Sequence, residues 1–167
     1  YLYILGGQLN GLTLSGTTSV EYALICTGSN SGVGGCSATA GTVGTWTTAT
    51  SMTLTRSEFR AAAYNGYIYA VGGNGCSIEY APILATGAIG NWSTSQSTLP
   101  DSCSQFGLAI YNGFMYVAGG NLDTDIIVDG YANTYYAALN ASTGEVGSWV
   151  SAYSFTAGRD SLDMVAS

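Results

Sequence analysis

The densest group of potential ligands in the sequence is the acidic run NLDTDIIVDG, which holds Asp123, Asp125 and Asp129. Three carboxylates this close together could bind Ca²⁺, a hard cation that prefers oxygen ligands. The spacing is not that of an EF-hand, because the third Asp comes too late and no closing Glu follows. The alternative interpretation is an exposed acidic loop tip, so calcium is the one cofactor that the sequence leaves open.

The chain contains no histidine. This removes the general base of a Ser-His-Asp triad and a usual ligand of catalytic zinc or copper. A pair of carboxylates, for example Glu58 with Asp101, could still perform acid–base chemistry, but nothing in the sequence places the two together. We therefore expect no catalytic residues in this chain. Beside the acidic run, Tyr131 and Asn133 could contact a sugar by ring stacking and hydrogen bonding.

Four cysteines give the next chemical signal. Cys26 and Cys36 flank the loop CTGSNSGVGGC, whereas Cys76 and Cys103 lie further apart. An even number of cysteines among short strands predicts disulfides and an oxidising compartment. The alternative is a metal site, which the absence of a CxxC motif and of histidine disfavours.

Composition excludes several classes of partner. The 167 residues are 47% hydrophobic and 8% charged. Ten acidic residues and only three arginines give a net charge of −7. Such a surface does not attract nucleic acid or anionic lipid, and no apolar run is long enough to span a membrane. The composition favours a secreted or cell-surface protein. Asn91 and Asn140 begin N-glycosylation sequons, which matter only if the source is eukaryotic.

The strongest signal is an internal repeat with three copies. Each copy has an apolar strand ending in two glycines, then a Tyr-Ala pair, then the pattern G-x-[VI]-G-x-W, then a Ser/Thr-rich stretch and a further strand. The double glycines are Gly6-Gly7, Gly72-Gly73 and Gly119-Gly120, and the tryptophans are Trp46, Trp92 and Trp149. Aromatic residues that recur in every copy, such as these tryptophans and Tyr22, Tyr80 and Tyr136, are expected to pack between units. Ligands are expected at the variable loops 8–19, 26–40, 74–77 and 121–133.

Each unit is interpreted as four antiparallel strands, which makes the chain all-β. The strands are an Ala-rich strand, a Tyr-x-Tyr strand, a strand around the Tyr-Ala pair, and one after the Trp. Asn-Gly pairs at 65–66 and 112–113 predict tight hairpins between the first two strands. The pattern also predicts a strand over the last residues, SLDMVAS (161–167), and no helix.

The order of these blocks, at about fifty residues a unit, resembles the kelch repeat. Kelch repeats form four-stranded blades of a β-propeller. The sequence motif Y-A-P-I…G-A-I-G-N-W is similar to those of kelch arrays on bacterial surface and secreted proteins. The family's Arg before the hairpin glycine is matched by Arg56 and Arg159, with Cys103 in that place in the middle unit. The propeller topology implies that Cys76 and Cys103 lie at one end of the blades and can meet, and that Cys26 and Cys36 lie at the other.

We expect a single β-propeller segment over 1–167, with repeats at 1–66, 67–113 and 114–167. Three blades do not close a propeller, which usually has ~4–8. Either further blades of the same chain complete it, or the last strand completes the first blade of a homo-oligomeric neighbour. The expected function is a non-enzymatic extracellular scaffold for protein or glycan binding, adhesion or assembly. The alternative is a fragment of a secreted carbohydrate-active enzyme whose catalytic residues lie outside these residues.

Overall fold

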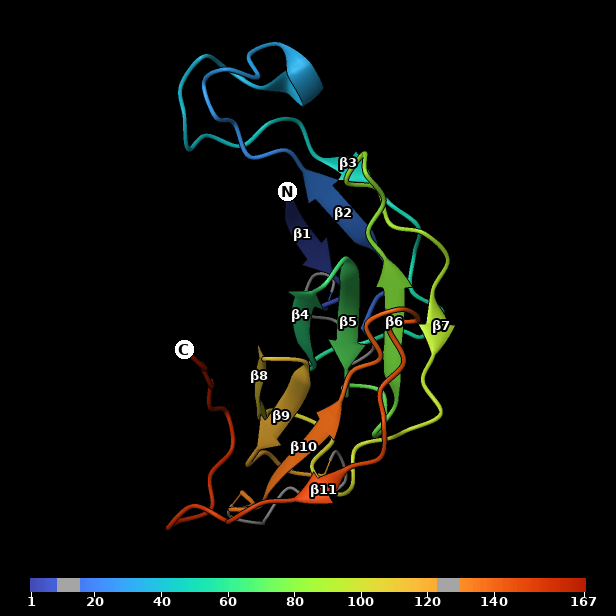
Figure 1. The fold of residues 1–167 in the computed structure, drawn as a ribbon, viewed down its shortest axis with the longest axis vertical. Helices are drawn as coiled ribbons and strands as arrows, with labels where there is room; N and C mark the ends of the chain where they lie inside the picture. Colours follow the sequence, from blue (N-terminus) through green and yellow to red (C-terminus); the bar gives the residue numbers. More distant parts are fainter. Residues whose placement is uncertain (9–15, 123–129) are drawn as a thin grey trace.

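The computed structural model describes residues 1–8, 16–122 and 130–167. These residues form three antiparallel sheets, stacked along a crescent with both chain ends on its concave side (Figure 1). Sheet 1 contains β1 (Leu2–Leu5), β2 (Val20–Ala23) and β3 (Thr47–Thr48). Sheet 2 contains β4 (Arg60–Tyr64), β5 (Tyr67–Val71), β6 (Ile78–Pro82) and β7 (Ser93–Thr94). Sheet 3 contains β8 (Gly107–Tyr111), β9 (Phe114–Ala118), β10 (Thr134–Ala138) and β11 (Val150–Ser151).

The all-β prediction is confirmed, with two corrections. Sheet 1 has three strands, so four-stranded units are found only in sheets 2 and 3. Residues 161–167 form no strand, contrary to the prediction for SLDMVAS. They run past β8, separated from it in part by a cavity of about 200 Å³. A strand needs a neighbouring strand for its ladder hydrogen bonds, and residues 161–167 have no such neighbour. β1, which is paired only with β2, lies at the opposite end of the crescent (Figure 1).

The only helical element among the described residues is a 3₁₀ turn, η1 (Val33–Gly35), in the connection from β2 to β3. None of the described helices is long and apolar enough to cross a bilayer.

The double glycines end one strand of each sheet and turn the chain toward the next. All six have positive φ, a conformation that glycine adopts without steric cost. The first glycine of each pair donates its amide hydrogen to a carbonyl just before the next strand, that of Ser19, Ser77 or Asn133 (2.9–3.0 Å). At Gly73, an added Cβ would lie 2.1 Å from the Ser57 carbonyl oxygen. At Gly73 a side chain therefore has no room, and at all six positions the positive φ favours glycine.

The two Asn-Gly pairs form the predicted hairpins. Asn65 and Gly66 join β4 to β5 with φ of 47° and 79°, and Asn112 and Gly113 join β8 to β9 with φ of 47° and 84°. Positive φ at both central residues is the requirement of a type I′ turn. The turns set the registers in which Tyr64 pairs with Tyr67 and Tyr111 with Phe114.

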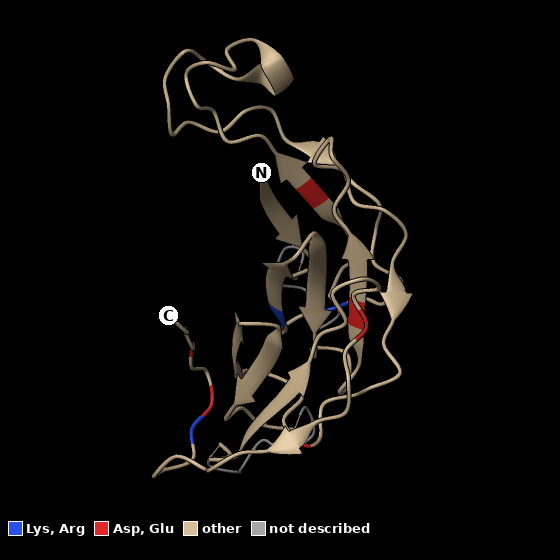
Figure 2. Cartoon of the chain, in the orientation of Figure 1, with Lys and Arg blue, Asp and Glu red and all other residues tan. Residues whose placement is uncertain are grey.

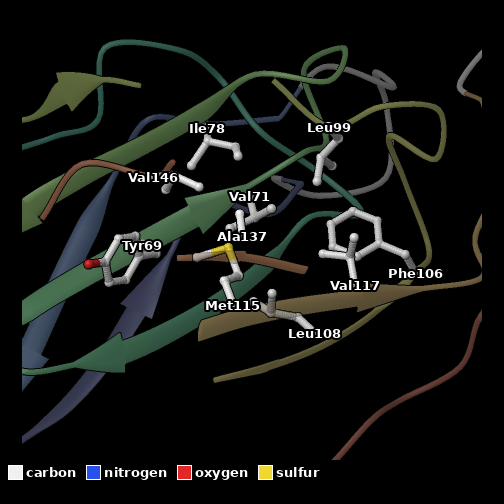
Figure 3. Close-up of a cluster of buried hydrophobic side chains, with 10 residues drawn as sticks. All are labelled: Tyr69, Val71, Ile78, Leu99, Phe106, Leu108, Met115, Val117, Ala137 and Val146. Carbon is white, nitrogen blue, oxygen red and sulfur yellow. The ribbon is translucent and has the colours of Figure 1, made fainter. Parts of the chain in front are cut away.

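The core consists of apolar layers between neighbouring sheets. On β5, Ile68 and Ala70 pack in the layer shared with sheet 1, while Tyr69 and Val71 pack in the layer shared with sheet 3. Figure 3 shows the second layer, in which side chains of sheets 2 and 3 such as Tyr69 and Met115 point toward one another. Full burial of a side chain of this size contributes ~1.5–3 kcal/mol. Sheet 2 is thus buried on both faces, and sheets 1 and 3 each keep one face free of a neighbouring sheet.

The G-x-[VI]-G-x-W pattern forms the turn before the last strand of each sheet. Its second glycine donates its amide hydrogen to the carbonyl of Leu24, Pro82 or Ala138 (2.8–2.9 Å). Trp92 then packs between sheets 1 and 2, where its indole Nε1–H donates to the Thr50 carbonyl at 2.9 Å. This confirms inter-sheet packing for Trp92.

Both disulfides form. Cys26 bonds to Cys36 inside the connection from β2 to β3, and Cys76 bonds to Cys103, joining the turn after β5 to the segment before β8. The two bridges lie at opposite ends of their sheets. Cys76 follows the end of β5 (Val71), whereas Cys26 follows the end of β2, where Ala23 pairs with Leu2 at the start of β1. The pairs indicate an oxidising, extracellular type of environment.

Candidate functional site

Polar side chains lie just before β4, before β8 and at the start of the final segment of the chain. The residues two positions before β4 and β8 are Glu58 and Gln105, and Ser161 occupies the corresponding place before the final segment. All three have a left-handed backbone, with φ of 56°, 56° and 50°. This conformation is uncommon for residues other than glycine, so its recurrence shows that one local turn is built three times.

These three side chains are hydrogen-bonded in series. The Gln105 amide Nε2–H donates to Glu58 Oε2 at 2.9 Å, and the Ser161 hydroxyl donates to Gln105 Oε1 at 3.0 Å. The backbone supports the first contact, because the Gln105 amide hydrogen also bonds to the Glu58 carbonyl at 3.2 Å. The series therefore crosses from one repeat to the next twice.

Asn121 and Asp160 extend the series on the side of the 121–133 loop. Asn121 Nδ2 donates to Gln105 Oε1 (3.3 Å) and to Asp160 Oδ2 (3.1 Å), and its own Oδ1 accepts a bond from the Ser104 hydroxyl (2.6 Å). We call Glu58, Gln105, Asn121, Asp160 and Ser161 the polar arc. All five are partly or fully exposed, so the arc is open to a ligand.

The polar arc combines groups that bind hydroxyl-rich molecules. Glu58 and Asp160 supply carboxylate acceptors, Gln105 and Asn121 supply both donors and acceptors, and Ser161 supplies a hydroxyl. Within the described residues, one oxygen of each carboxylate remains without a hydrogen-bond partner. The arrangement can accept and donate several hydrogen bonds along one side.

The predicted calcium ligands Asp123, Asp125 and Asp129 lie outside the described residues. Among residues 1–8, 16–122 and 130–167, no group of three acidic, cysteine or histidine side chains is arranged to hold a metal ion.

Glu58 and Asp101, the carboxylate pair considered from the sequence, are hydrogen-bonded to different residues and share no partner. Glu58 is bonded to Gln105, whereas Asp101 Oδ2 accepts hydrogen bonds from Asn133 Nδ2 and the Tyr135 hydroxyl, both at 2.7 Å. The bond to Asp101, together with burial, raises the pKa of Tyr135 to about 12. Asp101 is therefore held in a separate contact between sheets 2 and 3.

The proposed sugar contacts Tyr131 and Asn133 are placed differently. Asn133 is committed to Asp101, which leaves less of its amide for a ligand. Tyr131 is partly exposed at the end of the 121–133 loop, and its backbone amide and carbonyl bond to Gly120 and Arg159. Of the two, only Tyr131 has its side-chain polar group unpaired among the described residues.

Sequence reasoning missed Gln105, Asn121, Asp160 and Ser161. The available signal was positional, since Glu58, Gln105 and Ser161 align across the repeats and differ in type. The backbone conformation is the same at these three positions, whereas the side chain differs. Such positions can carry different binding groups.

No protein-family model and no curated protein sequence matches the chain. Its fold is similar to that of a solved structure titled "Structure of YjhT", with a TM-score of 0.56 and 14% sequence identity. The match covers 90% of this chain and 50% of that one, so the chain spans about half the length of the structure it matches. At this identity, the likeness describes the fold alone.

Proposed function

We propose that these residues are three kelch-like blades of an extracellular β-propeller that acts as a non-enzymatic binding scaffold, and that the polar arc binds a hydroxyl-rich glycan. The propeller is supported by the stacked antiparallel sheets and by the contact between β4 and β8, the first strands of neighbouring sheets. The two disulfides support an extracellular location.

The observation that carries the binding role is the hydrogen-bonded series from Glu58 through Gln105 to Ser161. The scaffold around these positions is repeated, while the side chains on it differ. A rigid framework holding varied hydrogen-bonding groups limits the entropy lost when a ligand binds. The low charge of the surface favours a ligand recognised by hydrogen bonds, because only three arginines and no lysine are present to bind an anion (Figure 2).

The test is a glycan microarray probed with the purified chain and with two variants of the arc, Gln105→Ala and Asp160→Asn. A hydrogen bond to a charged group contributes ~1.5–3 kcal/mol, so Asp160→Asn should weaken binding by roughly tenfold or more. Gln96→Ala is the matched control for Gln105→Ala, because Gln96 is exposed and uses only its backbone amide in a described bond.

Equal glycan binding by the parent chain and by Gln105→Ala would show that the polar arc is not the binding site. A different result would be that the parent chain binds no glycan but binds a protein ligand, and that Asp160→Asn loses this binding. The polar arc would then be a binding site for a protein and not for a glycan.

A further inference from the structure

Arg60 ties sheet 2 to the final segment of the chain, residues 161–167. It is the first residue of β4, it is half-buried, and its Nη2–H donates to the Leu162 carbonyl at 2.9 Å. Its Nη1–H donates to the carbonyl of the neighbouring Phe59 at the longer distance of 3.4 Å. Because Arg60 and Leu162 are 102 residues apart in the sequence, it is the stacking of the sheets that brings them together.

Sheet 3 leaves room for this contact at Gly107. Gly107 begins β8 and occupies the place of Arg60 in its own repeat, since each follows a residue with left-handed backbone by two positions. β4 contacts β8, and the final segment packs directly on Gly107, where an added Cβ would lie 2.9 Å from the Met164 Cβ. A side chain at Gly107 would push the final segment away from β8 and lengthen the distance that Arg60 has to span.

The carbonyl that accepts this bond lies next to the polar arc. Leu162 directly follows the arc residues Asp160 and Ser161. Asp160 Oδ2 accepts a hydrogen bond from Asn121 Nδ2 at 3.1 Å, and the Ser161 hydroxyl donates to Gln105 Oε1 at 3.0 Å. A shift of the Leu162 carbonyl would move both residues, because the backbone between them has a fixed reach. The bond to Leu162 therefore fixes the part of the arc that the final segment supplies.

The partners of Arg60 indicate that it holds the backbone and does not neutralise a carboxylate. The only ion pair among the described residues is that of Arg56 with Glu79, so Arg60 has no carboxylate partner there. A guanidinium that donates to a carbonyl forms a stronger hydrogen bond than a neutral donor does. Its planar, rigid arrangement of N–H groups also restricts the geometry of the contact. Arg60 is therefore suited to keep the final segment in one place.

We propose that Arg60 is a positioning residue of the polar arc. By binding the Leu162 carbonyl, it keeps Asp160 and Ser161 against the rest of the arc, and it thereby sets the affinity of the arc for its ligand without contacting that ligand. The proposal rests on the glycan-binding role proposed above. The geometry of the arc can nevertheless be measured with no ligand present, which separates the two proposals.

The first experiment follows the side-chain amide signals of Asn121 by heteronuclear NMR in the parent chain and in Arg60→Met, without glycan. Met keeps an unbranched aliphatic side chain and removes the N–H donors. We expect the Asn121 signals to shift and to exchange faster with water, because Asn121 Nδ2 donates to Asp160. The side-chain amide of Gln96 is the internal control, because Gln96 is exposed and uses only its backbone amide in a described bond.

Two further variants keep the test informative if Arg60→Met folds poorly. Arg60→Lys retains one charged donor group, so its Asn121 signals should lie between those of the parent chain and of Arg60→Met. Gly107→Ala leaves Arg60 in place but crowds Met164, so it should displace the final segment and shift the same Asn121 signals. Circular dichroism and a melting curve establish that each variant is folded.

The second experiment measures glycan affinity in a double-mutant cycle that combines Arg60→Met with Ser161→Ala. We expect Arg60→Met to weaken binding by the parent chain roughly tenfold and binding by Ser161→Ala roughly threefold or less, because residues that act through one another are not additive. If Arg60 contacted the ligand itself, the substitution would weaken binding by both proteins to the same extent.

Unchanged Asn121 signals in Arg60→Met overturn the proposal, whatever the glycan result. Additive effects in the cycle also overturn it, since Arg60 would then be a direct ligand contact, and so does parental affinity in Arg60→Met. If the parent chain binds no glycan, the proposed function fails, and the Asn121 signals alone decide whether Arg60 positions the arc.

Discussion

Arg56 and Glu79 form an ion pair, Nε to Oε2 3.0 Å, in which both side chains are completely buried. The pair joins the segment that leads into β4 to β6, two strands away in the same sheet. Burial lowers the pKa of Arg56, and the hydrogen bond and charge of Glu79 oppose that shift. Each charge is therefore tolerated inside the protein only because the other is present.

Removal of one partner should be strongly destabilising. Glu79→Gln keeps the size of the side chain and leaves the Arg56 charge buried without compensation, which costs ~3–5 kcal/mol. Urea unfolding followed by circular dichroism measures the change in the free energy of unfolding. Glu21→Gln is the matched control, because Glu21 is exposed and should change stability little. Equal effects of the two substitutions would contradict the structural role of the pair.

The bond between Cys76 and Cys103 should stabilise the whole fold. It closes a loop with a sequence separation of 27, for which the loss of unfolded-state entropy corresponds to ~3–4 kcal/mol. We expect Cys76→Ser to lower the melting temperature clearly. Cys26→Ser should lower it less, because the Cys26–Cys36 bridge closes a shorter loop in a connection away from both apolar layers.

Peptide mapping under non-reducing conditions should recover both pairs. A melting temperature that does not respond to reducing agent would show that neither bridge contributes to stability.

Tyr69, Tyr80 and Tyr135 should ionise late. Burial raises the pKa of Tyr69 to about 12, and burial together with the bond to Glu145 raises that of Tyr80 to about 12. Tyr135 reaches about 12 through its bond to Asp101 and burial. Because the folded pKa exceeds the ordinary tyrosine value of 10.0, the stability linked to each group is present below pH 10 and is lost as the pH rises toward 12.

Spectrophotometric titration of tyrosinate measures these transitions. Tyr135→Phe should remove one late-titrating group and leave the other two, which are in sheet 2. A single transition of all tyrosines near pH 10 in the folded protein would contradict the assigned environments.

Glu145 should link stability to acid pH. Burial opposes its ionisation, but hydrogen bonds from Ser95, from Tyr80 at 2.8 Å and from backbone amides outweigh burial and lower its pKa below 4.5. A lowered folded pKa contributes stability above pH 4.5, and this contribution is lost as the pH falls through the folded value. The melting temperature of Glu145→Gln should therefore lie below that of the parent at pH 7, and the difference should shrink in acid. A difference that is independent of pH would rule out the linkage.

The sequence by itself determined the repeat and most of its local structure. Glycines at 72–73 and 119–120 and the Asn-Gly pairs are residues that the backbone requires for positive φ, so they predict turns without reference to the rest of the chain. The apolar runs rich in Tyr, Ile and Val predicted the strands between them. The two disulfide pairs were expected only through the kelch resemblance, whose propeller topology implies that Cys76 and Cys103 lie at one end of the blades, and both pairs form.

Only the tertiary structure decided which polar residues meet. Glu58, Gln105 and Ser161 are separated by about fifty residues each in the chain and come together because neighbouring sheets start side by side. The pairing of Asp101 with Asn133 and Tyr135 depends on the same stacking. Residues 161–167 form no strand although their pattern is that of β4, because a strand is stabilised by hydrogen bonds to a neighbour, and a pattern of side chains cannot supply that neighbour.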